Sequence, residues 1–160
     1  MESTSGSSTP AAELQTLFSD LVRCETRLYN ALNDRLRERH GIVTSQYELL
    51  HHLRAHPGSR VADLAAAFAI GIGAASKSVD RLEQRGWLAR QPNPEDRRSS
   101  LLVLTEEGAQ LVGIAEQTFT ERVAELVEAT LDGSQVSAVS RAFAALRAAL
   151  ERDQIGMPTG

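Results

Sequence analysis

Basic side chains are concentrated in one part of the sequence, between residues 60 and 100. This stretch holds seven Arg or Lys residues against five Asp or Glu residues, a net charge of +2. The whole chain has a formal net charge of −4, so the remaining residues carry −6. A basic segment on an acidic chain is typical of a module that binds a polyanion, although the overall acidity argues against a nucleic-acid binder.

One group of polar side chains in this stretch could contact DNA from a helix. The spacing of four apolar residues predicts a helix over residues 72–85 whose buried edge is formed by Ile72, Ala75, Val79 and Leu82. The opposite face then carries Ser76, Lys77 and Arg81, which can bond to bases or phosphates when a helix enters the major groove.

A second group lies at the tip of a predicted hairpin. Residues 87–91 and 99–104 are typical of strands, and the PNPEDRR segment between them is typical of an exposed turn. Arg97 and Arg98 would bring two guanidinium groups to the narrow minor groove, which attracts positive charge. Asp96 is close enough in sequence to hold one of them in position. On spacing alone, a solvated cluster of charges explains these three residues equally well.

The other elements are predicted to be helices that position these two groups. Thr9 and Pro10 are expected to begin a long helix that runs to about residue 40, and Thr44 or Ser45 should cap the next. Residues 61–68 form a third, short helix. Thr105 and Asp132 should cap two more, Asp132 in a capping box with Gln135. The fold class is therefore mainly α with a small β-hairpin wing, a winged helix-turn-helix between N- and C-terminal helices. Residues 1–8 should be a disordered tail, and residues 9–160 a single domain.

Several other classes of protein are not expected. The sequence has no long apolar run and no signal peptide, so we expect a cytoplasmic protein. A single cysteine, Cys24, rules out an internal disulfide and a multi-thiolate metal site. Neither a glycine-rich phosphate loop nor a GxSxG motif occurs, and we therefore expect no enzyme, no metal site and no cofactor.

The motifs of residues 45–108 resemble the MarR family of transcriptional regulators. The similarity is strongest at Asp96-Arg97-Arg98, Leu104-Thr105 and Gly108, and is supported by VDRLE at residues 79–83 and by Arg85-Gly86. It implies a homodimer held by helices at about residues 9–40 and 105–153, with a DNA-binding lobe at about 44–104 that binds an inverted repeat. It also implies that Asp96 supports the wing, that Arg98 enters the minor groove, and that Ser76 and Lys77 face the major groove. Members of the family usually carry Ser or Thr where this chain has Gly71, Gly73 and Ala74, so base recognition here should depend on Ser76, Lys77, Arg81 and DNA shape.

The resemblance also implies that a small molecule could control DNA binding. An anionic or aromatic effector is expected near Tyr29, Tyr47 and Glu48. The first helix resembles that of urate-type regulators, and Glu48, Lys77 and Arg90 lie where that branch places its acid and arginines. Its N-terminal tryptophan is missing, which argues against urate itself.

Two further sensing sites have simpler explanations. Cys24 could act as a redox switch between Arg23 and Arg27, but it falls on the apolar stripe of its helix, where a thiol acts as a small buried hydrophobe. The four histidines lack further ligands at metal-binding spacing.

The sequence therefore predicts a homodimeric, sequence-specific double-stranded DNA-binding transcriptional regulator, most simply a repressor that a small molecule releases. The alternative is a winged-helix dimer that acts as a protein-interaction module and does not bind DNA.

Overall fold

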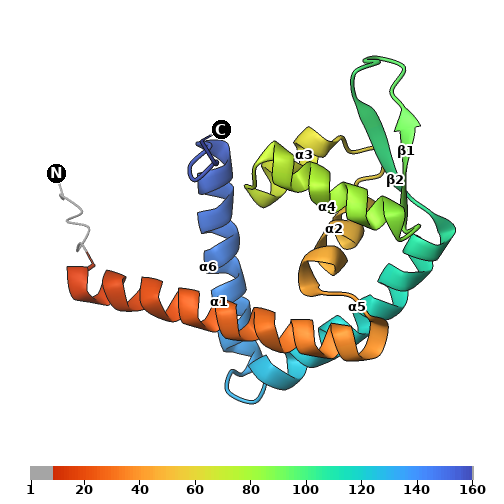
Figure 1. Cartoon of the computed structure of the whole chain (residues 1–160). Helices are drawn as coiled ribbons and strands as arrows, with labels where there is room; N and C mark the ends of the chain where they lie inside the picture. The colour runs from red at the N-terminus through yellow and green to blue at the C-terminus, as the bar shows by residue number, and fades with distance from the viewer. Residues whose placement is uncertain (1–8, 160) are drawn as a thin grey trace.

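The computed structural model describes residues 9–159, and the predicted tail at residues 1–8 lies outside them. The elements, in chain order, are α1 (Ala11–His40), α2 (Thr44–Ala55), α3 (Val61–Phe68), α4 (Ile72–Gln84), β1 (Leu88–Pro92), β2 (Ser100–Leu104), α5 (Glu106–Val127) and α6 (Gly133–Arg152). Figure 1 shows the β1–β2 hairpin projecting from a lobe of shorter helices that α1 and α5 support. The predicted fold class, mainly α with a hairpin wing, is confirmed.

Most helix ends lie where the local chemistry predicts them. The Thr105 hydroxyl accepts a hydrogen bond from the Gly108 backbone N–H at 3.0 Å and caps α5. Asp132 and Gln135 form the expected capping box of α6, with both hydrogen bonds at 2.9 Å. Gly86 ends α4 with φ of 76°, a conformation that costs other residues energy.

Two helix starts differ from the expectation. Pro10, not Thr9, is the N-cap residue of α1, and no side chain caps this helix. The N-cap residue of α2 is Val43, whose backbone N–H donates to Gln46 Oε1 at 3.0 Å. Thr44 is already helical and buried, and its N–H donates to Asn33 Oδ1 at 2.8 Å. A side chain from α1 thus satisfies a backbone group that a local cap was expected to satisfy.

An aliphatic core joins the lobe to the supporting helices. It includes the fully buried side chains Leu36, Ile42, Leu50, Leu53, Leu64, Val79, Leu82, Leu102 and Val112. Burial of each leucine side chain stabilises the fold by about 1.5–3 kcal/mol. This core fixes α4 and β2 relative to each other, because Val79 and Leu102 belong to the same cluster.

The hairpin is attached to the lobe along both strands. β1 and β2 pair antiparallel from Leu88 opposite Leu104 to Pro92 opposite Ser100. On the outer side of β2, the Leu102 N–H donates to the Ser59 carbonyl at 2.8 Å and the Gly58 N–H donates to the Leu102 carbonyl at 2.9 Å. The turn between α2 and α3 therefore holds the base of the hairpin.

Two expectations of burial, for Ile72 and Cys24, do not hold in the single chain. Ile72 is 64% exposed because it is the first residue of α4, and the helix reaches the core only from Ala75 onward. Cys24 is exposed, and so are Leu14, Phe18 and Leu21 on the same half of α1. Figure 1 shows the reason, since the N-terminal half of α1 extends beyond the other helices of the chain. The apolar stripe of α6 is likewise exposed in the single chain.

None of the helices in residues 9–159 is long and apolar enough to span a membrane alone. The pair α3 and α4 together has sufficient length and apolar composition, but the two helices meet at an angle of 115°.

Candidate nucleic-acid interface

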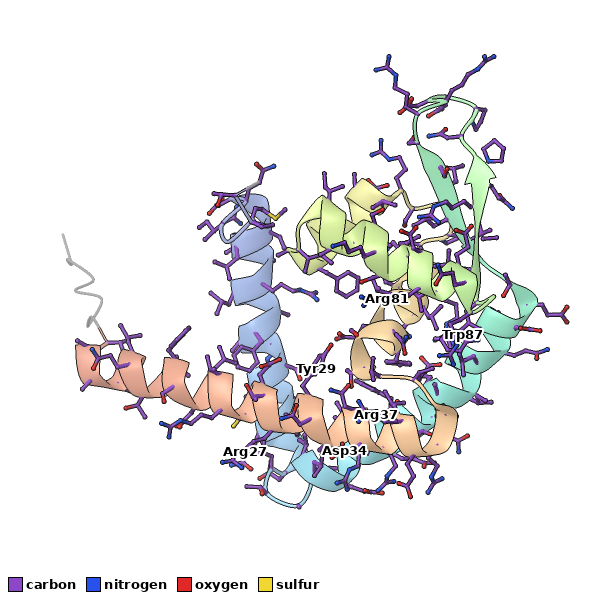
Figure 2. All side chains as sticks on the ribbon, in the orientation of Figure 1. Arg27, Tyr29, Asp34, Arg37, Arg81 and Trp87 are labelled. Carbon is purple, nitrogen blue, oxygen red and sulfur yellow. The ribbon has the colours of Figure 1, made fainter. Side chains whose placement is uncertain are left out.

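The exposed face of α4 carries the three residues predicted to contact DNA. Because Ala75, Val79 and Leu82 pack into the core, the opposite side of the helix is left to solvent. Lys77 and Arg81 are exposed there, and Ser76 is half-buried. Figure 2 labels Arg81 on this helix.

The wing tip carries Arg97 and Arg98, both exposed. Figure 2 shows nitrogen-ended side chains projecting from this tip, away from the helices. Asp96 Oδ1 accepts a hydrogen bond from the backbone N–H of Arg98 at 2.9 Å. Asp96 therefore shapes the turn, whereas the sequence suggested that it would hold a guanidinium group.

A second polar residue stabilises the same turn. Asn93 Oδ1 accepts from the Glu95 N–H at 3.0 Å, and Asn93 Nδ2 donates to Ser99 Oγ at 2.9 Å. These bonds connect the two ends of the turn, so the direction of Arg97 and Arg98 is set by side chains that could not be assigned from the charge pattern.

Arg90 on β1 connects the wing to α4. Its Nη2 donates to Asp80 Oδ1 at 2.6 Å, and its Nη1 donates to Glu83 Oε2. Burial lowers the pKa of Arg90, but the hydrogen bonds and negative charges of Asp80 and Glu83 outweigh this effect and raise the pKa above its ordinary value. Sequence analysis did not identify this contact. The signal was present as two acids one helical turn apart, followed by an arginine on the adjacent strand.

Pairing divides the basic side chains of the stretch into two groups. Arg60 is bonded to Asp63 at 2.9 Å, and the Arg85 guanidinium lies 4.2 Å from the Trp87 ring centroid. Within residues 9–159, no salt bridge is made by Lys77, Arg81, Arg97 or Arg98. Among the cations of this stretch, those with neither a carboxylate nor an aromatic partner are therefore on α4 and at the wing tip, which is the arrangement suited to phosphate and base contacts.

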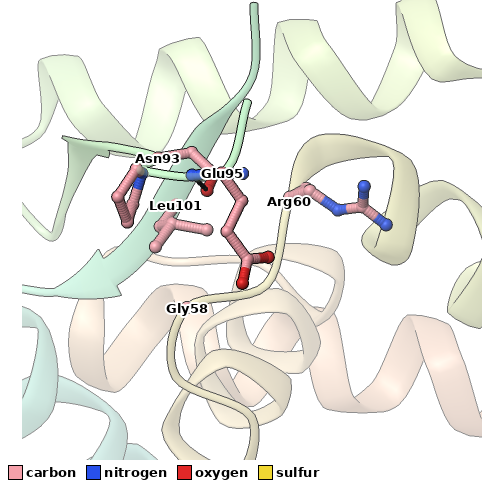
Figure 3. Close-up of a pocket in the computed structure, with 6 residues that line it drawn as sticks. Gly58, Arg60, Asn93, Glu95 and Leu101 are labelled. Atoms are coloured by element: carbon pink, nitrogen blue, oxygen red, sulfur yellow. Dashed lines mark hydrogen bonds between the residues drawn. The ribbon is translucent and has the colours of Figure 1, made fainter. Parts of the chain in front are cut away.

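A hollow lies at the base of the wing. It has a volume of about 550 Å³ and lies between the α2–α3 turn, at Gly58 and Arg60, and the hairpin residues Asn93, Glu95 and Leu101 (Figure 3). It is separate from the residues predicted to bind an effector.

The predicted effector residues lie between α1 and α2. Tyr29 Oη donates to Glu48 Oε2 over a long 3.5 Å contact, and Tyr47 is buried and stacks on Phe119 with ring centroids 4.5 Å apart. Tyr47 and Glu48 line a hollow of about 360 Å³, but Tyr29 is not among the lining residues. Burial raises the pKa of Glu48, against the Tyr29 hydrogen bond that lowers it, and Glu25 raises it further.

Three histidines at the end of α2 also line this hollow: His51, His52 and His56. His52 and His56 stack with centroids 4.4 Å apart, and burial, followed by the charges of His56 and His51, lowers the pKa of His52. His51 Nδ1 lies 3.7 Å from Glu116. Across the described part of the chain, no three His, Cys, Asp or Glu side chains gather as metal ligands would.

Comparison with known proteins identifies the family to which these features belong. Residues 42–100 match the profile of the MarR family. The chain is 30% identical over 101 residues to the multiple antibiotic resistance protein MarR of Salmonella typhimurium, an alignment that covers 59% of this chain and 70% of that protein. It is 35% identical over 95 residues to the transcriptional repressor MdtR of Bacillus subtilis, covering 58% and 61% of the two proteins.

Solved structures extend the similarity to nearly the whole fold. Sco3205 of Streptomyces coelicolor, a MarR family regulator solved in complex with DNA, superposes with a TM-score of 0.81 at 24% identity, covering 97% of this chain and 98% of that one. A mutant of MarR from E. coli, complexed with operator DNA, gives a TM-score of 0.76 at 24% identity over 87% of this chain and 99% of that one.

Proposed function

The chain belongs to the MarR family, and from that premise we propose that it is a transcriptional regulator that binds double-stranded DNA in a sequence-specific manner. The observation that carries the proposal is the placement of the unpaired cations. They lie on the exposed face of α4 and at the wing tip, and not on the rest of the basic stretch. A helix and a neighbouring hairpin with this charge can bind the major groove and the adjacent minor groove.

The proposal gives each site residue a role. Ser76, Lys77 and Arg81 contact base edges and phosphates in the major groove. Arg97 and Arg98 bind the adjacent minor groove or its phosphates, and Asp96 maintains the turn that presents them. Residues 44–104 form the DNA-binding lobe in this scheme.

Residues 9–40 and 105–153 are the dimerisation helices of the proposed homodimer. Phe18 on α1 is 68% exposed, and Phe143 and Leu146 on α6 are 42% and 51% exposed. A second copy of the chain would cover such side chains, whose exposure in one molecule is unfavourable. The two lobes would then bind an inverted repeat with half-site centres about 34 Å apart, one turn of the duplex.

We also propose that an anionic or aromatic small molecule releases the DNA. The hollow beside Tyr47 and Glu48 is lined by Phe68 and Phe119, which suits an aromatic ring. Repression is a simpler mode of action than activation, because release of the protein from DNA then switches transcription on. The relative MdtR is a transcriptional repressor. The proposal includes no enzymatic activity, and it keeps the expected cytoplasmic location, where the DNA would be.

Enrichment of genomic fragments by the purified protein tests the proposal. We expect enriched fragments to share an inverted repeat and to bind more tightly than random duplex of equal length. Recovery of fragments without a common sequence, together with no dependence of binding on salt, would instead support the protein-interaction module.

A further inference from the structure

Arg90 binds two acidic residues of the helix that the proposed function places against DNA. Asp80 and Glu83 are one helical turn apart on α4, and Arg90 reaches both from β1. The exposed fractions of the three side chains are 26% for Arg90, 52% for Asp80 and 40% for Glu83. An isolated exposed ion pair contributes little to stability, but one guanidinium group that bonds to two carboxylates fixes the direction of both partners.

The charges of this cluster oppose DNA binding. Two carboxylates and one guanidinium leave a net charge of −1 beside Lys77 and Arg81, which are the exposed cations of α4. Arg90 itself has both terminal nitrogens bonded to carboxylates, so it is not oriented towards a phosphate. Attraction to DNA therefore does not explain why these three residues occur together.

Their position in the fold provides an explanation. β1 follows α4 after a short turn at Gly86, whose φ is 76°, and its first residue, Leu88, is buried in the core. Arg90 is two residues later and thus on the same face of the strand as Leu88. On the other side of the hairpin, Ser59 holds β2 at Leu102. Arg90, in the middle of β1, joins the strand directly to α4 through its two hydrogen-bonded carboxylates.

We propose that Arg90 is a positioning residue for DNA binding, which bridges Asp80 and Glu83 and so fixes the wing relative to α4. This inference rests on the proposed function. The bridge sets the spacing between Lys77 and Arg81 on the helix and Arg97 and Arg98 on the wing tip, so that both groups bind adjacent parts of the same duplex. It therefore supports operator binding, where both groups must fit, more than binding to random DNA.

Affinities for a genome-selected operator and for a random duplex test this proposal. We expect Arg90→Gln to weaken operator binding by about fivefold and to leave binding to random duplex nearly unchanged. Arg90→Lys should recover little of the affinity, because a single ammonium group does not reproduce the two-sided fork of arginine. Asp80→Asn combined with Glu83→Gln should lower the ratio of operator to random affinity, even though it removes two negative charges.

A salt bridge outside the interface provides the matched control. Arg54 donates to Glu116 at 2.6 Å between α2 and α5, and Arg54→Gln should leave the affinity ratio unchanged. Circular dichroism and sedimentation would verify the folding and assembly of each variant. Should Arg90→Gln not fold, Arg90→Lys and the double variant on α4 decide the question.

Three results would overturn the proposal. Full operator affinity in Arg90→Lys would show that charge alone matters. An equal decrease in affinity for operator and random duplex would show a phosphate contact instead. A gain in operator affinity on removal of Asp80 and Glu83 would show simple repulsion. If the wild type does not distinguish its selected fragments from random duplex, the proposed function itself fails, which is a different result.

Discussion

A single carboxylate, that of Asp96, stabilises the turn of the wing through a hydrogen bond to the backbone. Asp96 accepts a hydrogen bond from the Arg98 N–H, so its effect on DNA is indirect. We expect Asp96→Ala to weaken operator binding, although simple electrostatics predicts that removal of a negative charge from the wing would strengthen it. Asp96→Asn retains the oxygen acceptor and should keep most of the affinity. Tighter binding by Asp96→Ala in a fluorescence titration would support the solvated charge cluster instead.

Lys77 provides a prediction about sequence recognition. It is exposed on α4 and makes no salt bridge with the described residues. If Lys77 contacts a base, Lys77→Ala should cost about 1–3 kcal/mol of operator binding and relax discrimination at one position of each half-site. Measurement of affinities for operators with single base changes would show this. Unaltered affinity and unaltered base preference would remove Lys77 from the interface.

Glu48 provides a prediction about pH. Burial raises the pKa of this carboxyl in the folded protein, so folding favours its neutral form. Its contribution to the free energy of unfolding is therefore fully present below its ordinary pKa and is lost as the pH rises through the raised value. Glu48→Gln does not titrate at this position and can still accept the Tyr29 hydrogen bond.

Denaturant unfolding of both proteins from about pH 4 to about pH 7 measures this difference. Relative to the variant, the wild type should lose stability as the pH rises. A relative gain over that range would show that the pKa of Glu48 is lowered, not raised.

The exposure of a side chain could be predicted from the sequence where it follows from the local helix or turn. Contacts between side chains that are distant in the sequence could not be predicted. Lys77, Arg81, Arg97 and Arg98 follow from periodicity and turn chemistry, and the structure leaves all four exposed. The bridge from Arg90 to α4 depends on how strand and helix pack, which no local pattern specifies. Whether the four exposed residues touch DNA remains a prediction.

At the scale of elements, the start of α5 is tightly packed against the backbone of Trp87, the residue before β1. Gly108 is buried, and a Cβ atom there would overlap the Trp87 backbone carbonyl. Thr105 also donates from its hydroxyl to the Gly86 carbonyl at 2.6 Å. The glycine in the family motif is therefore explained by close approach of two backbones.

This packing predicts that alanine substitutions at two glycines of α5 change the stability of the protein differently. Gly108→Ala should destabilise the protein by about 1–3 kcal/mol, because the added methyl group forces the backbones apart. Gly113 has no atom within 4 Å of an added Cβ atom, and Gly113→Ala should be neutral or stabilise by up to about 1 kcal/mol. Thermal or denaturant unfolding would compare them. Equal stabilities of the two variants would contradict the close contact at Gly108.

Element boundaries could be predicted where a side chain caps its own helix, as at Thr105 and Asp132. They were wrong at α2, because Asn33 on α1 supplies the acceptor for Thr44. Burial was wrong for Cys24 and Ile72 for a related reason. A periodic pattern predicts which face of a helix is apolar, but it does not say how much of that face the same chain covers.

At the scale of the whole molecule, the exposed apolar side chains of α1 and α6 predict a homodimer without a stable folded monomer. Phe143→Glu should disrupt this dimer, because a charge would be buried in its interface, and should lower the temperature of unfolding together with the sedimentation coefficient. Arg141, two residues from Phe143, lies on the opposite face of α6 from the apolar stripe, and Arg141→Glu therefore serves as a control. A folded wild-type monomer at micromolar concentration in sedimentation would contradict this assembly.

The salt dependence of operator binding tests the central claim most directly, because it counts the phosphates that the protein neutralises. The measurement compares the wild type with Arg97→Ala/Arg98→Ala, after sedimentation has shown that both have the same assembly. We predict that log K falls linearly with log salt for the wild type, and that the double variant binds more weakly and with a slope smaller by about one unit for each phosphate that it no longer neutralises. Identical affinities and identical slopes for the two proteins would contradict the assignment of the wing to DNA, and no salt dependence in either would contradict DNA binding altogether.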